Sequence, residues 1–211
     1  AKASLMQGIT TEFGGVDGRS PVDIGAFLAQ LAEEGTGVNY GTFLGQGSVR
    51  KHVMGWAQGP ASEAQLREMK GLVRQAMEDG AFGLSTGLEY QPGSFAGTVE
   101  IAELVRETAP YGGIYATHVR SEGDAVVEAV QEALEIGRKA GVPVNLSHLK
   151  IVHYRNWAKE DEVVRLIEEA RDAGQRVFAD VYPYLAPDYA VNRPLSEWAS
   201  ALPPEHLLIV D

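Results

Sequence analysis

The sequence contains no cysteine, and this absence limits the chemistry that the chain can carry out. Without thiols it can form neither disulfide bonds nor thiolate metal sites, so any metal must be bound by nitrogen and oxygen atoms. The lack of disulfides also agrees with a cytoplasmic location, which is what we expect.

Clustered basic residues and long apolar runs are lacking as well. Eighteen Lys and Arg residues, scattered along the chain, stand against 29 Asp and Glu, for a formal net charge of −11. Nucleic acids and anionic membranes attract clustered cations, so we expect neither as a partner. No apolar run reaches the length of a membrane span, and the first residues lack the order of a signal peptide. The oligomeric state stays open.

The 211 residues are enough for one sizeable domain. Apolar runs of strand type alternate with segments of helical spacing, which predicts an α/β fold with a parallel sheet. No linker interrupts the pattern, so we predict a single domain over residues 1–211. We expect strands at about 5–13, 38–44, 81–86, 114–117, 142–147 and 176–181, and helices at about 21–34, 62–79, 98–109, 123–139 and 158–173, then a Pro-rich stretch, a short helix near 195–201 and a last apolar run at 206–210.

Two architectures fit this alternation: an open doubly wound sheet and a closed (β/α)₈ barrel of the TIM-barrel type. The barrel is favoured because polar residues follow every strand, whereas a doubly wound sheet concentrates its site at one switch point. Six strands are two short of a complete barrel. We therefore predict a partial barrel.

Two histidines occupy equivalent positions in consecutive strand-helix units. His118 follows an apolar run that ends in Thr117, and His148 follows the next such run, which ends in Ser147. Parallel strands joined by a helix bring their carboxyl ends side by side, so the two imidazoles can reach one metal ion. Either histidine alone could be a hydrogen-bonded structural residue, but the repetition favours a shared site.

Several motifs, in order from Gln7 to about Tyr184, resemble one enzyme family. They are Gly-Leu-Ser-Thr-Gly-Leu-Glu-Tyr-Gln-Pro-Gly at 83–93, Gly-Gly-Ile-Tyr-Ala-Thr-His-Val-Arg-Ser-Glu-Gly-Asp at 112–124, Val-Pro-Val-Asn-Leu-Ser-His-Leu-Lys at 142–150 and Ala-Asp-Val-Tyr-Pro-Tyr at 179–184. The chain thereby resembles the N-acyl-D-amino-acid deacylase (D-aminoacylase) branch of the metal-dependent amidohydrolases. The resemblance implies a (β/α)₈ barrel flanked by a small β-domain, with this chain covering about strands two to seven.

The resemblance also implies a metal site. The family has a metal-ligating cysteine after strand two, in a Gly-Asn-Cys-Gly turn, and the aligned turn here is Gly15-Val16-Asp17-Gly18. We therefore expect Asp17, His118 and His148 to hold Zn²⁺, as one or two divalent ions. A carboxylate in place of a thiolate shifts the preference toward harder ions. Two alternatives stay open: Asp17 could instead support the turn, or the alignment could slip by one residue.

A carboxylated lysine after strand four bridges two metals in many other amidohydrolases. The end of that strand here is Leu84-Ser85-Thr86 and has no lysine, which leaves Asp17 as the best candidate for the anionic ligand.

The function implied is hydrolysis of the amide bond of N-acyl-D-amino acids, small-molecule substrates, by a metal-activated water. By resemblance, Lys150 and Tyr182 match substrate-binding positions, and Tyr90 lies in the loop over the site. Arg120 is a further candidate for substrate binding, with an Arg120–Glu122 ion pair as the alternative. We expect Asp180 to orient a neighbouring group. His52 and His153 are assigned to surface loops.

The segment carries no expected catalytic group apart from the metal ligands. The general-base Asp of strand eight and a His-X-His pair of strand one are expected outside it, so the segment alone should be inactive. Two rival readings remain: a cyclic-amide hydrolase of the dihydroorotase or hydantoinase type, and a non-catalytic truncated remnant. The Gly-Leu-Glu-Tyr-Gln-Pro-Gly motif and the lysine-free strand four count against the cyclic-amide hydrolase.

Overall fold

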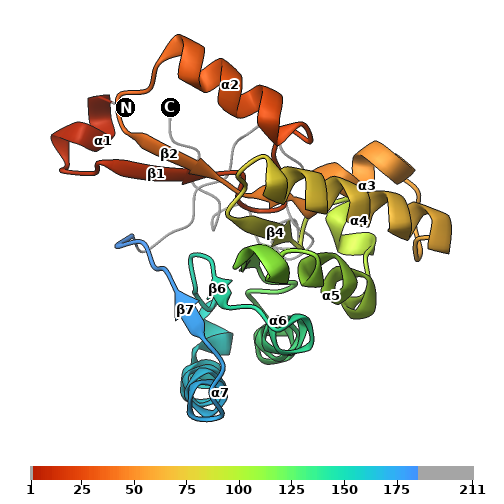
Figure 1. Cartoon of the computed structure of the whole chain (residues 1–211). Helices are drawn as coiled ribbons and strands as arrows, with labels where there is room; N and C mark the ends of the chain where they lie inside the picture. The colour runs from red at the N-terminus through yellow and green to blue at the C-terminus, as the bar shows by residue number, and fades with distance from the viewer. Residues whose placement is uncertain (1, 185–211) are drawn as a thin grey trace, which may run out of the picture. The chain divides into compact units, whose positions relative to one another are not determined.

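Residues 2–184 are described in the computed structural model of the chain (Figure 1). The chain divides into two compact units, Ala1–Val181 and Tyr182–Asp211, and the first carries all the described helices and strands. In order, the elements are α1 Lys2–Met6, β1 Thr11–Gly14, α2 Ile24–Glu34, β2 Asn39–Thr42, β3 Leu44–Gly45, α3 Gln46–Met54, α4 Glu63–Glu78, β4 Gly83–Gly87, α5 Thr98–Arg106, β5 Ile114–His118, α6 Val126–Ala140, β6 Val144–Leu146, α7 Glu160–Asp172 and β7 Val177–Ala179, with short 3₁₀ turns at Gly93–Phe95, Ala109–Tyr111 and Tyr154–Lys159.

The described strands form two parallel ladders, and within each ladder every strand pairs with the next one along the chain. One ladder joins β1 to β2, and a second runs β3-β4-β5-β6-β7. A doubly wound sheet reverses its strand order at a switch point, and the described strands show no such reversal. The predicted α/β fold with a parallel sheet is confirmed, and the strand order is that of a barrel.

The second expected strand, residues 38–44, is divided at Phe43. On one side of the break, the Phe43 N–H donates to Gly14 O at 3.0 Å, and on the other the Phe82 N–H donates to Thr42 O at 2.9 Å. These bonds place residues 39–45 between β1 and β4. The two ladders thus follow one another as successive strands of a single curved wall.

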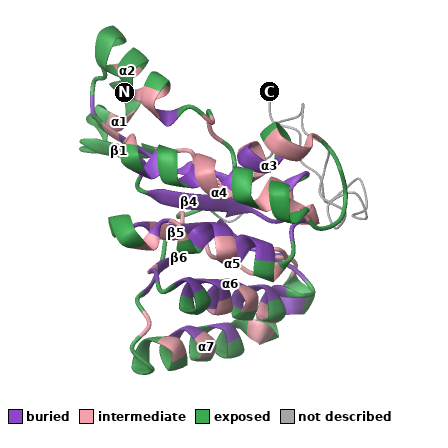
Figure 2. Cartoon of the chain, turned by 45° about the vertical axis from the view of Figure 1, so that its right-hand side comes forward, coloured by how far each residue is buried: buried purple, intermediate pink, exposed green. Residues whose placement is uncertain are grey.

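Helices α3 to α7 lie next to one another in chain order and cover the outer side of the strands (Figure 2). Their buried residues face the sheet and their exposed residues face solvent, which is the pattern of an amphipathic helix. The core between the layers is apolar. Its fully buried members include Leu84, Val144 and Leu146 from the strands and Ile101, Leu104, Val130 and Ile136 from the helices.

Two local predictions near the N-terminus were wrong. Residues 2–6 form α1, so the first strand starts only at Thr11, because Ala, Lys, Leu and Met favour helix and Gly8, with a φ of 79°, ends it. Helix α2 begins after Asp23, whose carboxylate accepts the Ala26 N–H at 2.8 Å, and not at residue 21 as predicted. The Ser20 hydroxyl accepts the Gly45 N–H at 2.8 Å instead.

Helix α3 was missed, since no helix was predicted between residues 34 and 62. Gly45 and Gly47 are turn residues in sequence terms, but Val49 and Arg50 are fully buried and hold the helix against the core. The sequence Ser62-Glu63-Ala64-Gln65 predicts a capping box at the start of α4, and the structure confirms it: the Ser62 hydroxyl and the Gln65 side chain each accept the other's backbone N–H.

The expected helix near 195–201 and the apolar run at 206–210 lie outside the described residues. Among residues 2–184, no helix combines the length and apolar character that a membrane span requires.

Candidate metal centre

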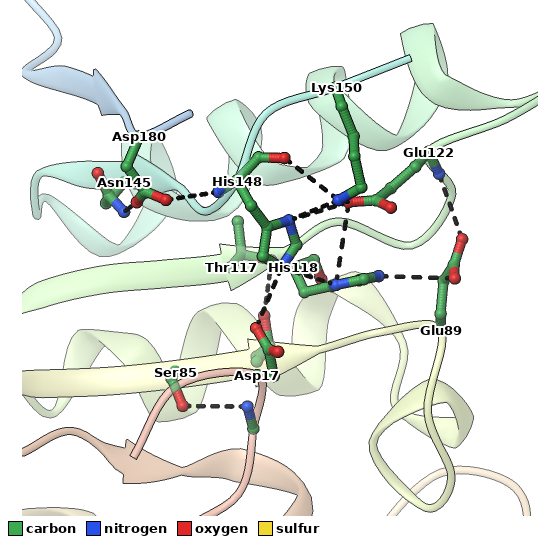
Figure 3. A network of polar contacts seen from close by, with 12 residues as sticks. Asp17, Ser85, Glu89, Thr117, His118, Glu122, Asn145, His148, Lys150 and Asp180 are labelled. Carbon is green, nitrogen blue, oxygen red and sulfur yellow. Dashed lines mark hydrogen bonds and ion pairs between the residues drawn. The ribbon is translucent and has the colours of Figure 1, made fainter. Parts of the chain in front are cut away.

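Three side chains from distant parts of the chain converge at the carboxyl ends of the strands (Figure 3). Asp17 lies in the turn after β1, His118 ends β5, and His148 follows β6. One donor atom from each lies within 4.8 Å of the others. His118 Nδ1 is 3.0 Å from His148 Nε2, which is 3.3 Å from Asp17 Oδ1. The structure thus brings together the three residues that were predicted as ligands.

The turn that carries Asp17 is fastened to β4. The Gly18 N–H donates to Ser85 Oγ at 3.1 Å, and the Ser85 hydroxyl donates to Gly15 O. Asp17 itself has a φ of 54°, a left-handed conformation that aspartate tolerates better than most residues. Because Ser85 holds the turn, the Asp17 carboxylate is left to point at His148.

The backbone of His148 is also left-handed, with a φ of 40°. Its N–H donates to Asp180 Oδ1 at 2.7 Å, and Asn145 Nδ2 donates to Asp180 Oδ2 at the same distance. Asp180 therefore contacts the backbone of a predicted ligand, as the orienting role expected for it requires.

Two buried carboxylates lie beside the imidazoles, a position that the sequence did not predict for either of them. Glu122 Oε1 lies 3.0 Å from His148 Nδ1, and Glu89 Oε2 lies 3.5 Å from His118 Nε2. Their side chains are only 2% and 5% exposed. Nothing local in the sequence separates these acids from surface residues. Their positions, four residues after His118 and in the turn after β4, are the only signals that could have found them.

Charges in this cluster stabilise one another. Burial lowers the pKa of His148, but hydrogen bonds with Asp17 and Glu122 outweigh it and raise the pKa to about 9. Burial raises the pKa of Asp17 and Glu122, but in both the hydrogen bond with His148 and nearby positive charges prevail and lower it. At neutral pH the two carboxylates are therefore ionised, and the raised pKa favours the protonated form of His148.

Comparison with known proteins identifies the family. No family profile matches the chain. D-aminoacylase from Alcaligenes xylosoxydans xylosoxydans is 40% identical over 160 residues, which are 76% of this chain and 33% of that protein. A crystal structure of D-aminoacylase, described as defining a novel subset of amidohydrolases, superposes with a TM-score of 0.80 at 33% identity, over 86% of this chain and 43% of that one. The chain belongs to the D-aminoacylase branch of the amidohydrolases.

Other members of this branch give information on the metal centre and on the length of the proteins. N-acyl-D-glutamate deacylase from Bordetella bronchiseptica, solved with zinc and a phosphonate inhibitor that mimics the tetrahedral intermediate, superposes with a TM-score of 0.82 at 32% identity, over 86% of this chain and 43% of that one. A D-aminoacylase structure is described in terms of a binuclear metal centre. The chain spans about a third of the length of the curated relatives it matches. The predicted family and the partial TIM-barrel fold are confirmed.

Likeness to cyclic-amide hydrolases is weaker. L-hydantoinase from Arthrobacter aurescens superposes with a TM-score of 0.54 at 18% identity, over 86% of this chain and 41% of that one. At this identity only the fold is shared. The comparison gives no support to the cyclic-amide reading.

Of the residues that the deacylase resemblance assigned to substrate, Lys150 and Tyr90 lie at the centre. The Lys150 ammonium pairs with Glu122 and lies 3.0 Å from His148 Nδ1. The Tyr90 ring centroid is 4.8 Å from that of His118, and Tyr90 and Asp17 both line a pocket of about 490 Å³. Tyr182 belongs to the second unit and is not placed relative to this centre.

The guanidinium of Arg120 is occupied by protein groups. It donates to both carboxylate oxygens of Glu132, at 2.7 and 2.9 Å, and to the carbonyls of Ser94 and Ala96, both at 3.0 Å. The alternative Arg120–Glu122 ion pair is therefore wrong. Contact between Arg120 and substrate stays a prediction, which these bonds do not favour.

Within residues 2–184, His52 and His153 lie outside the cluster that could hold a metal ion. His52 is exposed on α3, not in a loop as expected. His153 is half-buried beside Tyr154, with ring centroids 4.7 Å apart.

Proposed function

We propose that this chain provides the metal-binding edge of an N-acyl-D-amino-acid deacylase, which hydrolyses the amide bond of small acylated D-amino acids. One observation carries the proposal: Asp17, His118 and His148 present an oxygen and two nitrogen donors within 4.8 Å at the carboxyl ends of barrel strands. The relatives named above are deacylases of this kind, and their names point to the same substrates.

The donor set fits a divalent cation. Zinc ligands lie about 2.0–2.2 Å from the ion, so in a tetrahedral site they are about 3.3–3.6 Å from one another. The donor separations of 3.0 and 3.3 Å are close to that spacing. Two imidazoles and one carboxylate suit zinc, and the absence of thiolate widens the choice to harder ions. We propose Zn²⁺, as one or two ions, with these three residues as ligands.

Zinc bound in such a site supplies Lewis acidity and activates water at neutral pH. The surrounding residues orient and bind. Glu122 contacts a ring nitrogen of His148 and orients that ring, and Glu89 faces a ring nitrogen of His118. The Lys150 ammonium offers a positive charge to a substrate carboxylate, and Tyr90 borders the adjoining pocket. Tyr182 is proposed as a further substrate contact by resemblance alone.

A cytoplasmic location is also proposed, since the chain contains no cysteine that would call for an oxidising compartment.

Metal analysis tests the proposed centre directly. The purified chain is expected to bind zinc, and the double variant His118→Ala/His148→Ala to lose it, whereas His52→Ala should bind as the wild type does. Unchanged metal content in the double variant would discard the centre. In the gene product that contains the chain, N-acetyl-D-amino acids should be hydrolysed in preference to their L enantiomers, and the opposite preference would refute the deacylase assignment.

A further inference from the structure

We propose that Glu122 is the positioning residue of the metal centre: its carboxylate keeps the proton of His148 on Nδ1 by accepting a hydrogen bond from that nitrogen in competition with the neighbouring Lys150 ammonium. The inference rests on the proposed function and deepens it. It concerns the availability of His148 Nε2, the nitrogen that faces Asp17 and His118 (Figure 3).

Hydrogen bonds of its backbone hold Glu122 to both neighbouring loops. Its N–H donates to Glu89 Oε1 at 3.3 Å, and its carbonyl accepts the Val152 N–H at 2.8 Å. The side chain is 2% exposed, and Oε2 has no hydrogen-bond partner within the described part of the protein. Burying a carboxylate is strongly unfavourable unless cationic and N–H partners compensate for it. A surface acid would avoid this cost, so the burial calls for a role at the centre.

One oxygen of Glu122 serves both neighbours. Oε1 lies 3.0 Å from His148 Nδ1, and it also forms the ion pair with Lys150 Nζ. Lys150 Nζ is itself only 3.0 Å from His148 Nδ1. The imidazole nitrogen therefore has two competing partners, of which the carboxylate only accepts a hydrogen bond and the ammonium only donates.

The competition decides the tautomer of His148. When Nδ1–H donates to Glu122, the lone pair of Nε2 is available to a cation, as in carboxylate-histidine-zinc arrangements. If the carboxylate were absent, the Lys150 ammonium would donate to Nδ1, and the ring proton would move to Nε2. Nε2 would then no longer be a ligand. Glu122 thus protects the centre from the lysine beside it.

Metal titration of the 211-residue chain tests this inference with zinc, and with cobalt for its absorption spectrum. Glu122→Ala should bind about 10- to 100-fold more weakly than the wild type, which is the usual effect of removing such an outer carboxylate. Glu122→Gln keeps an acceptor oxygen and should lose less. The decisive variant is Glu122→Ala/Lys150→Met, in which the competing ammonium is gone and affinity should recover severalfold over Glu122→Ala. A merely structural role for Glu122 predicts no such rescue.

Glu100→Gln is the matched control, since Glu100 is also a buried acid paired with a cation but lies away from the centre. It should lower stability without changing metal affinity, and thermal unfolding of each metal-free variant shows that the fold is kept. Wild-type affinity in Glu122→Ala, or no recovery in the double variant, would overturn the inference alone. Failure of the wild type to bind metal would overturn the proposed centre and the inference with it.

Discussion

Asp17 and His148 are 131 positions apart in the sequence, yet Asp17 Oδ1 lies 3.3 Å from His148 Nε2. The strands that carry them, β1 and β6, are separated by four strand-to-strand intervals. In a flat sheet, with strands about 4.8 Å apart, four intervals would span about 19 Å, more than two such side chains can bridge. The contact therefore depends on the curvature of the barrel wall, and the candidate metal centre exists only because the sheet is rolled.

Asparagine at position 17 separates the charge of this residue from its backbone conformation. Asp17→Asn keeps the left-handed φ of 54°, which asparagine also tolerates, but removes the anionic ligand. We expect zinc affinity to fall at least tenfold while the unfolding temperature of the metal-free chain stays within a few degrees. Isothermal titration calorimetry and thermal unfolding measure the two quantities. Equal zinc affinity would mean that Asp17 supports only the turn.

Cation binding should depend on pH through His148. Its folded-state pKa of about 9 exceeds the ordinary value of about 6.5, so protonation stabilises the metal-free fold below pH 6.5, and this contribution is lost as the pH rises through 9. A cation competes with that proton. Zinc affinity should therefore rise about tenfold per pH unit between pH 7 and 8.5, as chelator competition can measure. A flat profile would show that no proton is displaced from the centre.

A buried ion pair fastens the connection between α3 and α4. Arg50, fully buried, pairs with Glu100 on α5, whose second oxygen accepts the Ala61 N–H at 3.1 Å. Removing one partner leaves an uncompensated buried charge, so Glu100→Ala should lower the free energy of unfolding by about 3–5 kcal/mol. Arg67→Ala, which breaks an exposed pair with Glu63, should cost less than about 1 kcal/mol. Urea unfolding measures the loss of stability in each variant, and similar losses in Glu100→Ala and Arg67→Ala would contradict this account.

Glycine 137 allows α6 to pack closely on β6. A methyl group there would lie 2.0 Å from Val144 Cγ2, and Val144 is fully buried. Alanine in a helix gains about 1 kcal/mol over glycine, but overpacking costs about 1–3 kcal/mol, so Gly137→Ala should be destabilising overall. Gly71→Ala on α4 meets no atom within 4 Å and should stabilise by up to about 1 kcal/mol. Chemical denaturation measures the change in free energy of unfolding for both variants. Stabilisation by both substitutions would show that α6 can move away from β6 at little cost.

Patterns close together in the sequence predicted much of this protein. The Ser62 capping box, the alternation of strands and helices and the repeat that ends in His118 and His148 all depend on neighbouring residues, and each is present as expected. Helix α3 was missed because glycines in and beside it lower the helix propensity of the local sequence. The burial of Arg50, which holds this helix against the core, depends on residues that are remote in the sequence.

The partners of the acidic and basic side chains could not be predicted in this way. Glu122 pairs with Lys150 and His148, not with Arg120, and Glu89 faces His118. The amino-acid sequence by itself determined most of the elements, their order and the positions of the two histidines, since these follow from local periodicity and capping. Tertiary structure alone decided that Glu89 and Glu122 join Asp17 beside them, because strand curvature sets the distances between remote loops and burial determines which charges must be paired.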